Sequence, residues 1–247
     1  MTVMLRKGRF AARYAQSDAD VTAAQRLRHR SFVINAGRTA LSGGLDRDAY
    51  DRCCRHVLIE DAAGRLAACF RLLLLPDGTT IGRSYAAQYY DLTRLAAFPG
   101  PLVEIGRFCI DPDLKNPDLL RVAWGALAGF VDQHGVRLLF GCSSFAGVDP
   151  VVYAAAFERL GTDHPAPARW APGVKAPEVV RYPVQGTDRQ LALLQMPPLL
   201  RSYLGIGGWV SDHAVVDRAM NTLHVFTGVE IAAIPALRAR VLRAVAV

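Results

Sequence analysis

Apolar and polar residues alternate along the chain with two periods, one typical of strands and one typical of helices. Residues 10–16 are predicted to form a first strand. Residues 18–33 repeat apolar side chains at helical spacing behind Ser17, a residue type that caps helices. Two more strands are predicted over 56–60 and 66–75.

The middle of the chain contains the clearest helix signal. A strand predicted over 103–110 is stopped by Asp111 and Pro112. After it, Asn116 can cap a helix, Pro117 suits the first helical position, and the helix is predicted to end at Gly135. Its apolar face comprises Leu120, Ala123, Trp124, Leu127, Ala128 and Val131.

The second half of the chain begins with the wholly apolar residues 137–142, which are typical of a strand inside a sheet. A second helix is predicted over 150–160, and a strand near Val179 within an otherwise irregular stretch. Strands and helices alternate without a long linker, so we predict one α/β domain over residues 1–247, with a mixed central sheet flanked by helices.

Composition narrows the class of protein. Of 247 residues, 51% are hydrophobic and 21% are charged, as in globular proteins, and the net charge is +7. A basic surface suits an anionic membrane, an acidic protein or a nucleic acid, but the chain has no arginine-rich cluster with interleaved aromatic residues, so we expect no nucleic-acid partner. Five cysteines without a C-x-x-C pair and six scattered histidines argue against a metal site. No apolar run reaches the length of a signal peptide or a membrane span, which predicts a cytoplasmic location.

The run Glu104-Ile105-Gly106-Arg107-Phe108-Cys109 carries the strongest chemical signal. In a strand, Glu104, Gly106 and Phe108 are expected on one face, and Ile105, Arg107 and Cys109 on the other. A carboxylate in the middle of a strand is costly unless it is paired or exposed. The residues alone leave two alternatives open, a salt-bridged strand on a half-exposed sheet or a functional site.

Other charged residues precede this run in a fixed order. Arg28 and Phe32 lie one helical turn apart, the loop of residues 35–52 contains Asp48, Tyr50 and Asp51, and Arg71 follows late in a strand. With E-x-x-R-F, this ordered set resembles the acyl-homoserine-lactone synthases and the ornithine-lipid N-acyltransferases, two families of the GNAT superfamily. The resemblance implies a GNAT-like acyltransferase fold in which the matching Arg, Asp and Glu positions line the acceptor and acyl-thioester site.

The remaining sequence favours the second of these families. The lactone synthases usually carry a Trp shortly after the R-x-x-x-F helix, where this chain has Asn35-Ala36-Gly37-Arg38. Residues 140–150 and 196–222 resemble the ornithine-lipid enzymes, which makes residues 191–247 a family-specific C-terminal extension packed on the domain. The resemblance implies an N-acyltransferase that moves a (3-hydroxy)fatty acyl group from acyl carrier protein to the α-amine of an amino acid, giving a lyso-aminolipid. Ornithine is favoured, while glutamine and glycine stay open.

No cofactor is expected, because the donor substrate is the acyl-4′-phosphopantetheine of acyl carrier protein. GNAT acetyltransferases hold coenzyme A pyrophosphate on a glycine-rich turn, whereas Lys115-Asn116-Pro117-Asp118 has no glycine and carries an acid at the helix start. Lys115 and Asn116 are therefore expected to bind a single phosphate of the carrier. The amphiphilic product predicts transient contact with an anionic membrane surface, peripheral at the inner membrane. A lactone-synthase-like enzyme and a non-catalytic acyl- or lipid-binding module remain the alternatives.

Each candidate site residue receives an expected role. Glu104 positions or deprotonates the amine, and Arg107 holds Glu104 or a neighbouring acid. Asp48 and Asp51 bind the cationic groups of the acceptor, while Arg28 or Arg71 binds its carboxylate; sheet-edge ion pairs are the alternative for both arginines. The other expected substrate contacts are Phe32, Phe108, Ser143 and Ser144. The leucines of residues 191–206 could line an acyl channel or belong to a cover helix.

Overall fold

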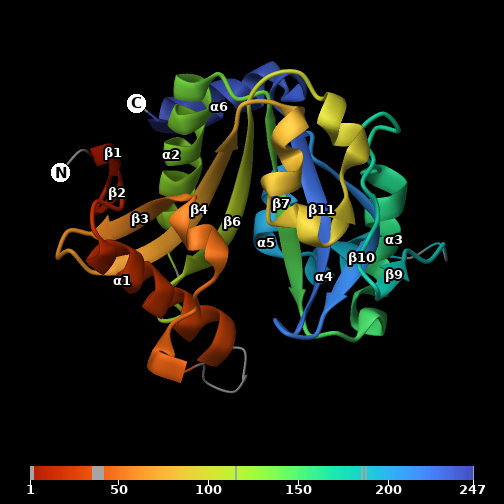
Figure 1. Ribbon diagram of the computed structural model, residues 1–247, viewed down its shortest axis with the longest axis horizontal. Coiled ribbons are helices and arrows are strands. Elements are labelled where there is room, and N and C mark those ends of the chain that lie inside the picture. Colours follow the sequence, from red (N-terminus) through yellow and green to blue (C-terminus); the bar gives the residue numbers. More distant parts are fainter. Residues whose placement is uncertain (1–2, 35–41, 115, 185, 187, 247) are drawn as a thin grey trace. The chain divides into compact units, whose positions relative to one another are not determined.

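The computed structural model describes residues 3–34, 42–114, 116–184, 186 and 188–246. The chain forms two compact units, shown in Figure 1. Unit 1 comprises Met1–Leu74, Ile105–Val136 and Ala236–Val247, and unit 2 comprises Leu75–Glu104 and Arg137–Pro235. Strand β6 (Leu102–Ile110) contributes its first three residues to unit 2 and the others to unit 1.

The sheet of unit 1 is built from sequential strands. β1 (Val3–Lys7), β2 (Phe10–Tyr14), β3 (Arg55–Asp61) and β4 (Leu66–Leu75) pair in antiparallel order, and β6 follows β4. The predicted strands of this unit are confirmed, whereas β1 escapes prediction because its five residues show no clear alternation.

Two helical regions cover the sheet of unit 1. α1 (Asp18–His29) packs Ala24 and Leu27 against apolar residues of β3, β4 and β6. Ser17 caps it as predicted, accepting a hydrogen bond from the Asp20 amide. A π-helical turn (Arg30–Ile34) continues α1.

Helix α2 confirms the helix signal in the middle of the sequence. It spans Asp118–His134, contacts β1, β2 and β3, and packs against α6 (Ala236–Ala246). Pro117 is the N-cap, one residue later than predicted, and the Asn116 side chain accepts from the Asp118 amide at 2.9 Å; Gly135 ends the helix with a φ of 58°. Glycine suits this position because it adopts the left-handed conformation without steric cost.

The sheet of unit 2 is mixed. Residues Leu102 to Glu104 of β6 pair in parallel with β7 (Leu138–Ala146). Antiparallel pairing then continues through β11 (Thr222–Glu230), β10 (Trp209–Asp217) and β9 (Val179–Arg181). The parallel and antiparallel pairs together confirm the prediction of an α/β protein with a mixed sheet.

Three helices form the layer beside the unit 2 sheet. They are α3 (Ala154–Asp163), α4 (Arg189–Gln195) and α5 (Pro198–Gly205). The apolar side chains of α3 and α5 meet those of β7, β10 and β11 in one core, which includes Phe145, Phe157, Leu200, Leu204, Val210 and Val225, whereas α4 contacts α3. Burial of such side chains from water is the main favourable contribution to folding.

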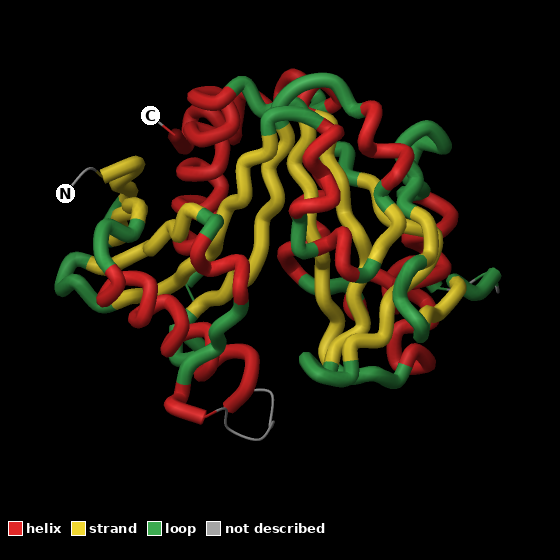
Figure 2. The backbone as a smooth tube through the Cα atoms, viewed as in Figure 1, coloured by secondary structure: helices red, strands yellow, loops and turns green. Residues whose placement is uncertain are grey.

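The segment between β4 and β6 has no counterpart in the sequence prediction. It winds through short 3-10 turns at Gly78–Arg83, Ala86–Gln88 and Thr93–Ala97, drawn red in Figure 2. Its strand β5 (Tyr90–Asp91) pairs with β8 (Gly173–Val174) in a small second sheet. Hydrophobic periodicity does not detect turns of three to six residues, because they are shorter than one repeat of an amphipathic helix.

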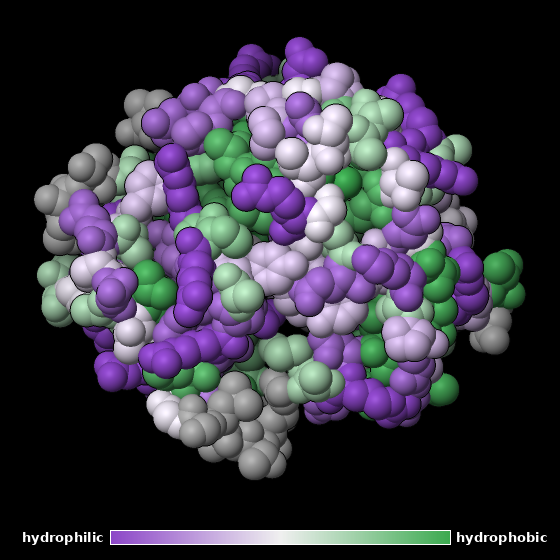
Figure 3. Space-filling view, in the orientation of Figure 1, coloured by the Kyte–Doolittle hydropathy of each residue, from purple (hydrophilic) through white to green (hydrophobic). Residues whose placement is uncertain are grey.

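The surface drawn in Figure 3 is mostly hydrophilic, with hydrophobic side chains in small patches. Over the described ranges, every helix is too short or too polar to traverse a bilayer.

Candidate active site

Six charged side chains gather in unit 1. Arg28 comes from α1, Arg71 from β4 and Arg107 from β6, and the segment before β3 supplies the three carboxylates Asp46, Asp48 and Asp51. We call these six residues the arginine–aspartate network. Three positive and three negative charges balance, which is what allows so many ionised groups to be buried together.

Arg28 lies deepest in the network, with 1% of its side chain exposed. Its Nη1 and Nη2 atoms donate to the two carboxylate oxygens of Asp51, each at 2.8 Å. Its Nε donates to Oδ2 of Asp46 at 2.9 Å, and Nη2 also donates to the Asp46 carbonyl. The forked guanidinium fixes the loop to α1 through this bidentate geometry.

The other two arginines complete the network from the sheet. Nη2 of Arg71 donates to Asp48 at 2.8 Å, and its Nη1 donates to Asp51 at 2.9 Å. Arg107 donates from Nε to Asp46 and from Nη2 to Asp48, both at 3.1 Å. Arg107 therefore holds neighbouring acids, one of the two roles that the sequence left open for it.

The loop that carries the three aspartates is itself organised by them. Asp48 caps the turn Ala49–Arg52 by accepting from the Tyr50 amide at 2.9 Å. Burial alone would raise the pKa of Asp51, but the hydrogen bonds and charge of Arg28, the hydrogen bond from Gln25 and the charge of Arg71 together hold that pKa well below its usual range. Burial likewise opposes the ionisation of Asp48, but the hydrogen bond and charge of Arg71 together with the charge of Arg107 lower its pKa. Both carboxylates are therefore ionised at neutral pH.

One sequence expectation about β6 is wrong. Gly106 does not share a face with Phe108, because Arg107 has a φ of 53° and this left-handed conformation interrupts the alternation of the strand. A Cβ at Gly106 would lie 3.3 Å from Nε of Arg71, on the side of the network, whereas Phe108 stacks on Phe70 with ring centroids 5.7 Å apart. Because Gly106 has no side chain, there is room for the Arg71 guanidinium.

Phe32 lies in the π-helical turn that follows α1. It is half-buried and packs against the apolar cluster formed by Ala24, Leu27, Leu58, Cys69 and Cys109. A packing role accounts for its position, and its expected substrate contact stays a prediction.

Glu104 belongs to unit 2, where its side chain is buried. Its Oε2 accepts from the Tyr85 amide and its Oε1 from the Ala86 amide, both at 2.7 Å. The carboxylate thus fixes the start of the 3-10 turn Ala86–Gln88. Its role toward a substrate amine stays a prediction.

A polar aromatic cluster follows this turn within unit 2. The hydroxyls of Tyr85 and Tyr89 lie 3.3 Å apart, and the Tyr89 hydroxyl donates to Asp217 at 3.4 Å. The Tyr90 hydroxyl donates to the His224 carbonyl at 2.8 Å. Burial lowers the pKa of His224 from its ordinary value of 6.5 to about 4, so this imidazole is neutral at pH 7.

The remaining predicted residues are used structurally. Ser143 is buried and accepts a hydrogen bond from Thr227 at 2.9 Å, whereas Ser144, its neighbour on β7, is exposed. The side-chain oxygen of Asn116 accepts a hydrogen bond from the Asp118 amide, the first of α2, and Lys115 lies outside the described residues. Substrate or phosphate contacts of these residues stay predictions.

The leucines of the C-terminal stretch divide between the interior and the surface. Leu200 and Leu204 lie in the core of unit 2, as a cover helix requires, while Leu193 and Leu194 are exposed. No acyl channel is needed to account for the buried pair.

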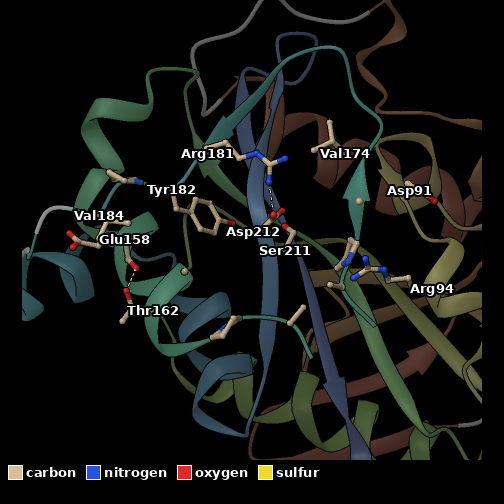
Figure 4. A pocket seen from close by; sticks show the side chains of 17 residues that line it. Asp91, Arg94, Glu158, Thr162, Val174, Arg181, Tyr182, Val184, Ser211 and Asp212 are labelled. Carbon is tan, nitrogen blue, oxygen red and sulfur yellow. Dashed lines mark hydrogen bonds and ion pairs between the residues drawn. The ribbon is translucent and has the colours of Figure 1, made fainter. Parts of the chain in front are cut away.

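Unit 2 also contains a cavity of about 550 Å³, drawn in Figure 4. Arg181 and Asp212 form an ion pair at its wall, and Glu158 and Tyr182 face it from neighbouring elements. As far as the described residues show, its lining includes no predicted site residue. In the same described part of the chain, no group of three or more Cys, His, Asp or Glu side chains could hold a metal ion.

The sequence analysis did not identify Asp46, which belongs to the network, or Gln25, which lies beside it. Asp46 binds both Arg28 and Arg107, and Gln25 donates to Asp51 at 2.9 Å. Gln25 lies one helical turn before Arg28, and Asp46 lies two residues before Asp48. Helical spacing from a candidate arginine was therefore a signal that could have found Gln25.

The sequence is similar to that of known acyltransferases. Residues 27–125 match the acetyltransferase (GNAT) domain family. The chain is 34% identical over 229 residues to a Rhodobacter capsulatus protein named L-ornithine N(alpha)-acyltransferase, a match that covers 87% of this chain and 88% of that protein.

Two solved structures resemble the fold. TofI, in a ternary complex with an inhibitor and MTA, gives a TM-score of 0.52 at 18% identity, over 96% of this chain and 100% of that one. FeeM, an N-acyl amino acid synthase from uncultured soil microbes, gives 0.51 at 10% identity, over 91% and 92%. These likenesses and the domain match confirm the prediction of a GNAT-like acyltransferase fold.

Proposed function

The chain belongs to the L-ornithine N(alpha)-acyltransferase family, and from this premise we propose that it transfers a fatty acyl group from a thioester to the α-amine of ornithine. It is an acyltransferase of the GNAT type. The observation that carries the proposed acceptor is the likeness to the Rhodobacter capsulatus enzyme over 88% of that protein's length. The arginine–aspartate network supports it, because carboxylates can bind the ammonium groups of a diamino acid and guanidinium groups can bind its carboxylate.

The proposed reaction needs no covalent enzyme intermediate. The neutral α-amine attacks the thioester carbonyl, the C–N bond forms, and the tetrahedral intermediate expels the thiolate. The amine loses one proton, and the thiolate gains one. We assign Glu104 the role of accepting the amine proton, through a water molecule because both of its oxygens already accept backbone amides. A backbone N–H of β6 is the proposed donor to the oxyanion.

Exposure distinguishes the network residues that a ligand would reach. Asp48 and Arg107 have 20% and 13% of their side chains exposed, whereas Arg28 and Arg71 have 1% and 3%. We therefore propose that Asp48 binds the side-chain ammonium of ornithine and Arg107 its carboxylate. In this proposal Arg28, Asp51 and Arg71 hold Asp48 and Arg107 in position. They then act on the substrate through these two residues, whereas the sequence analysis expected Asp51 and one of the two buried arginines to bind it themselves.

For the donor, we propose the phosphopantetheine of acyl carrier protein. The net charge of +7 favours an acidic partner. Asp118 stands at the start of α2, where it disfavours a pyrophosphate. The N-acylated product is an amphiphile, so the proposal includes transient contact of the protein with an anionic membrane surface.

The acceptor is tested by mass spectrometry of the product. Purified protein with acyl carrier protein loaded with a 3-hydroxyacyl chain is offered ornithine, glutamine or glycine in separate reactions. The expected product is the α-N-acyl derivative of ornithine, formed with release of the carrier thiol. Acylation of glutamine or glycine with ornithine unused would overturn the acceptor, and thiol release that never requires an amine would overturn the reaction.

Glu104→Gln tests the proposed proton acceptor. It should lower kcat by about 10²–10⁴-fold, the usual contribution of general-base catalysis. The pH dependence of the residual rate should shift, since hydroxide then replaces the carboxylate. Glu178→Gln, the same change at an exposed ion pair with Arg218 of unit 2, should leave kcat unaltered. A folded Glu104→Gln variant with full kcat would contradict the assignment.

A further inference from the structure

Helix α6 of unit 1 presents an apolar stripe to the outside. Leu237 and Val241 lie one helical turn apart and are 66% and 55% exposed. Ala244, one turn further, is exposed as well. Surface leucine and valine side chains so close together on one helix leave apolar area in water, which is unfavourable.

The opposite side of α6 accounts for its attachment. Ala239 and Leu242 are half-buried, α6 packs against α2, and the Arg243 guanidinium donates to both Asp132 oxygens at 2.9 and 3.0 Å. The spacing of these residues places them away from the Leu237 stripe. The stripe is therefore not the face that holds the helix to unit 1.

The charge beside the stripe has one sign. Arg238 and Arg240 flank Leu237 and Val241 on the two sides of the helix, both are exposed, and neither forms an ion pair within the described residues. The sequence of α6, ALRARVLRAVA, contains no acidic residue. An apolar stripe bordered by arginines is the pattern of a helix that lies in the plane of a membrane interface, with arginines at the phosphates and aliphatic side chains below them.

We propose that the Leu237–Arg238–Arg240–Val241 face of α6 docks onto an anionic lipid surface, an inference that rests on the proposed function because the acylated product is itself a membrane lipid. The charge beside the stripe favours a lipid surface, because Arg238 and Arg240 are cationic and anionic headgroups are complementary to them. A single helix face with two arginines gives weak, reversible contact, which suits an enzyme that meets a soluble donor and releases a lipid product.

Vesicle flotation of the full-length protein tests this surface without any substrate. Wild type should float with phosphatidylcholine vesicles that contain about one third phosphatidylglycerol, and not with pure phosphatidylcholine. Arg238→Gln with Arg240→Gln should weaken partition about thirtyfold, at about 1 kcal/mol per arginine. Leu237→Asn with Val241→Asn should weaken it at least tenfold through loss of apolar burial.

Matched variants separate this face from general charge. Arg26→Gln with Arg52→Gln removes the same charge from exposed positions of unit 1 and should change partition less than about twofold, and Leu191→Asn with Leu194→Asn tests the exposed leucines of α4. Equal loss in the arginine control, or loss confined to the α4 variant, would overturn the proposal.

Turnover in vesicle-free solution distinguishes this inference from the proposed function. The α6 variants should keep wild-type kcat/KM with a soluble short-chain donor. If they float like wild type but lose turnover with acyl carrier protein alone, the helix docks the carrier and the lipid surface is wrong. If wild type floats as expected but acylates no amine, the proposed function fails and the surface stands.

Discussion

At the scale of single residues, the stability of unit 1 depends on the balance of charges in the arginine–aspartate network. Asp51→Asn removes one of its charges while Arg28 stays buried. Removing one partner of a buried ion pair costs about 3–5 kcal/mol, because the other charge is left uncompensated. We expect the free energy of unfolding from urea titration to fall by about 3 kcal/mol.

The double variant Arg28→Met with Asp51→Leu is the control for that loss. It removes both charges, so it should recover part of the stability lost in Asp51→Asn. A loss below about 1 kcal/mol in the single variant would show that water already solvates the pair.

His224 makes the stability of unit 2 depend on pH. Unfolded His224 binds a proton near pH 6.5, whereas the folded residue binds one only near pH 4. The unfolded state therefore takes up more protons in this window, and the free energy of unfolding falls as the pH drops from 6.5 towards 4. Between pH 7 and 5 the loss should be about 2 kcal/mol.

A series of urea titrations at different pH values measures this effect. His224→Gln cannot titrate, so its free energy of unfolding should change less over the same range, even if the variant is less stable at pH 7. A pH dependence identical to that of wild type would assign the effect to another group.

The sequence indicated most of the charged residues of the network but not what they bind. Arg28, Asp48, Asp51, Arg71 and Arg107, which carried the family resemblance, all fall in it, while their contact with substrate stays a prediction. Their bonds to one another could not be predicted, because the pairing depends on a loop whose course is set by tertiary contacts. The left-handed φ of Arg107 could not be predicted either, because residue type indicates this conformation mainly for glycine and asparagine, and not for arginine.

At the scale of elements, two glycines that look alike in sequence have opposite roles. A Cβ at Gly228 of β11 would lie 2.4 Å from the Trp209 ring, so Gly228→Ala must displace that indole from its stack on Phe226. Overpacking of this kind costs about 1–3 kcal/mol. Gly129 lies exposed inside α2 with open space at its Cβ position, so Gly129→Ala should stabilise by about 1 kcal/mol.

Thermal unfolding of the two variants checks this pair. The melting temperature should fall for Gly228→Ala and rise for Gly129→Ala. A stable Gly228→Ala variant would mean that the tryptophan ring moves at no cost.

Elements with a full repeat of hydrophobic pattern were predictable. α2 is one case, and the paired strands β3 and β4 are another. The 3-10 turns of residues 78–97 were not predictable, because they are held by contacts such as the close approach of Gly78 to the Leu95 carbonyl, where a Cβ would lie 2.2 Å away. Glu104 likewise binds amides of a turn that the pattern does not show.

At the scale of the whole molecule, the net charge of +7 should govern the encounter with the donor. Attraction between a basic enzyme and an acidic carrier protein accelerates association, and salt screens it over a Debye length of about 8 Å at physiological ionic strength. We expect kcat/KM for acyl carrier protein to exceed that for acyl coenzyme A and to fall about tenfold or more between low and high salt. Equal values for both donors at low salt would reject the carrier as the preferred donor.

The α/β class and the mixed sheet could be predicted from alternating elements, whereas the division of β6 between two units could not. Its residues Leu102 to Ile110 form one uninterrupted strand, and neither periodicity nor composition changes after Glu104. The prediction of one domain over residues 1–247 rested on the absence of a linker, and it stays a prediction.

This division determines the order in which a growing chain can be completed on the ribosome. Synthesis proceeds at about 5–20 residues per second, and unit 1 draws on Met1–Leu74, Ile105–Val136 and Ala236–Val247. The parallel pairing of Leu102 and Val103 can form only after β7 is translated, and α6 can cover α2 only after Ala236–Ala246 is translated. While residues 135–235 are being synthesised, the nascent chain therefore carries a bare helix face, which makes it a natural client for chaperones during that interval.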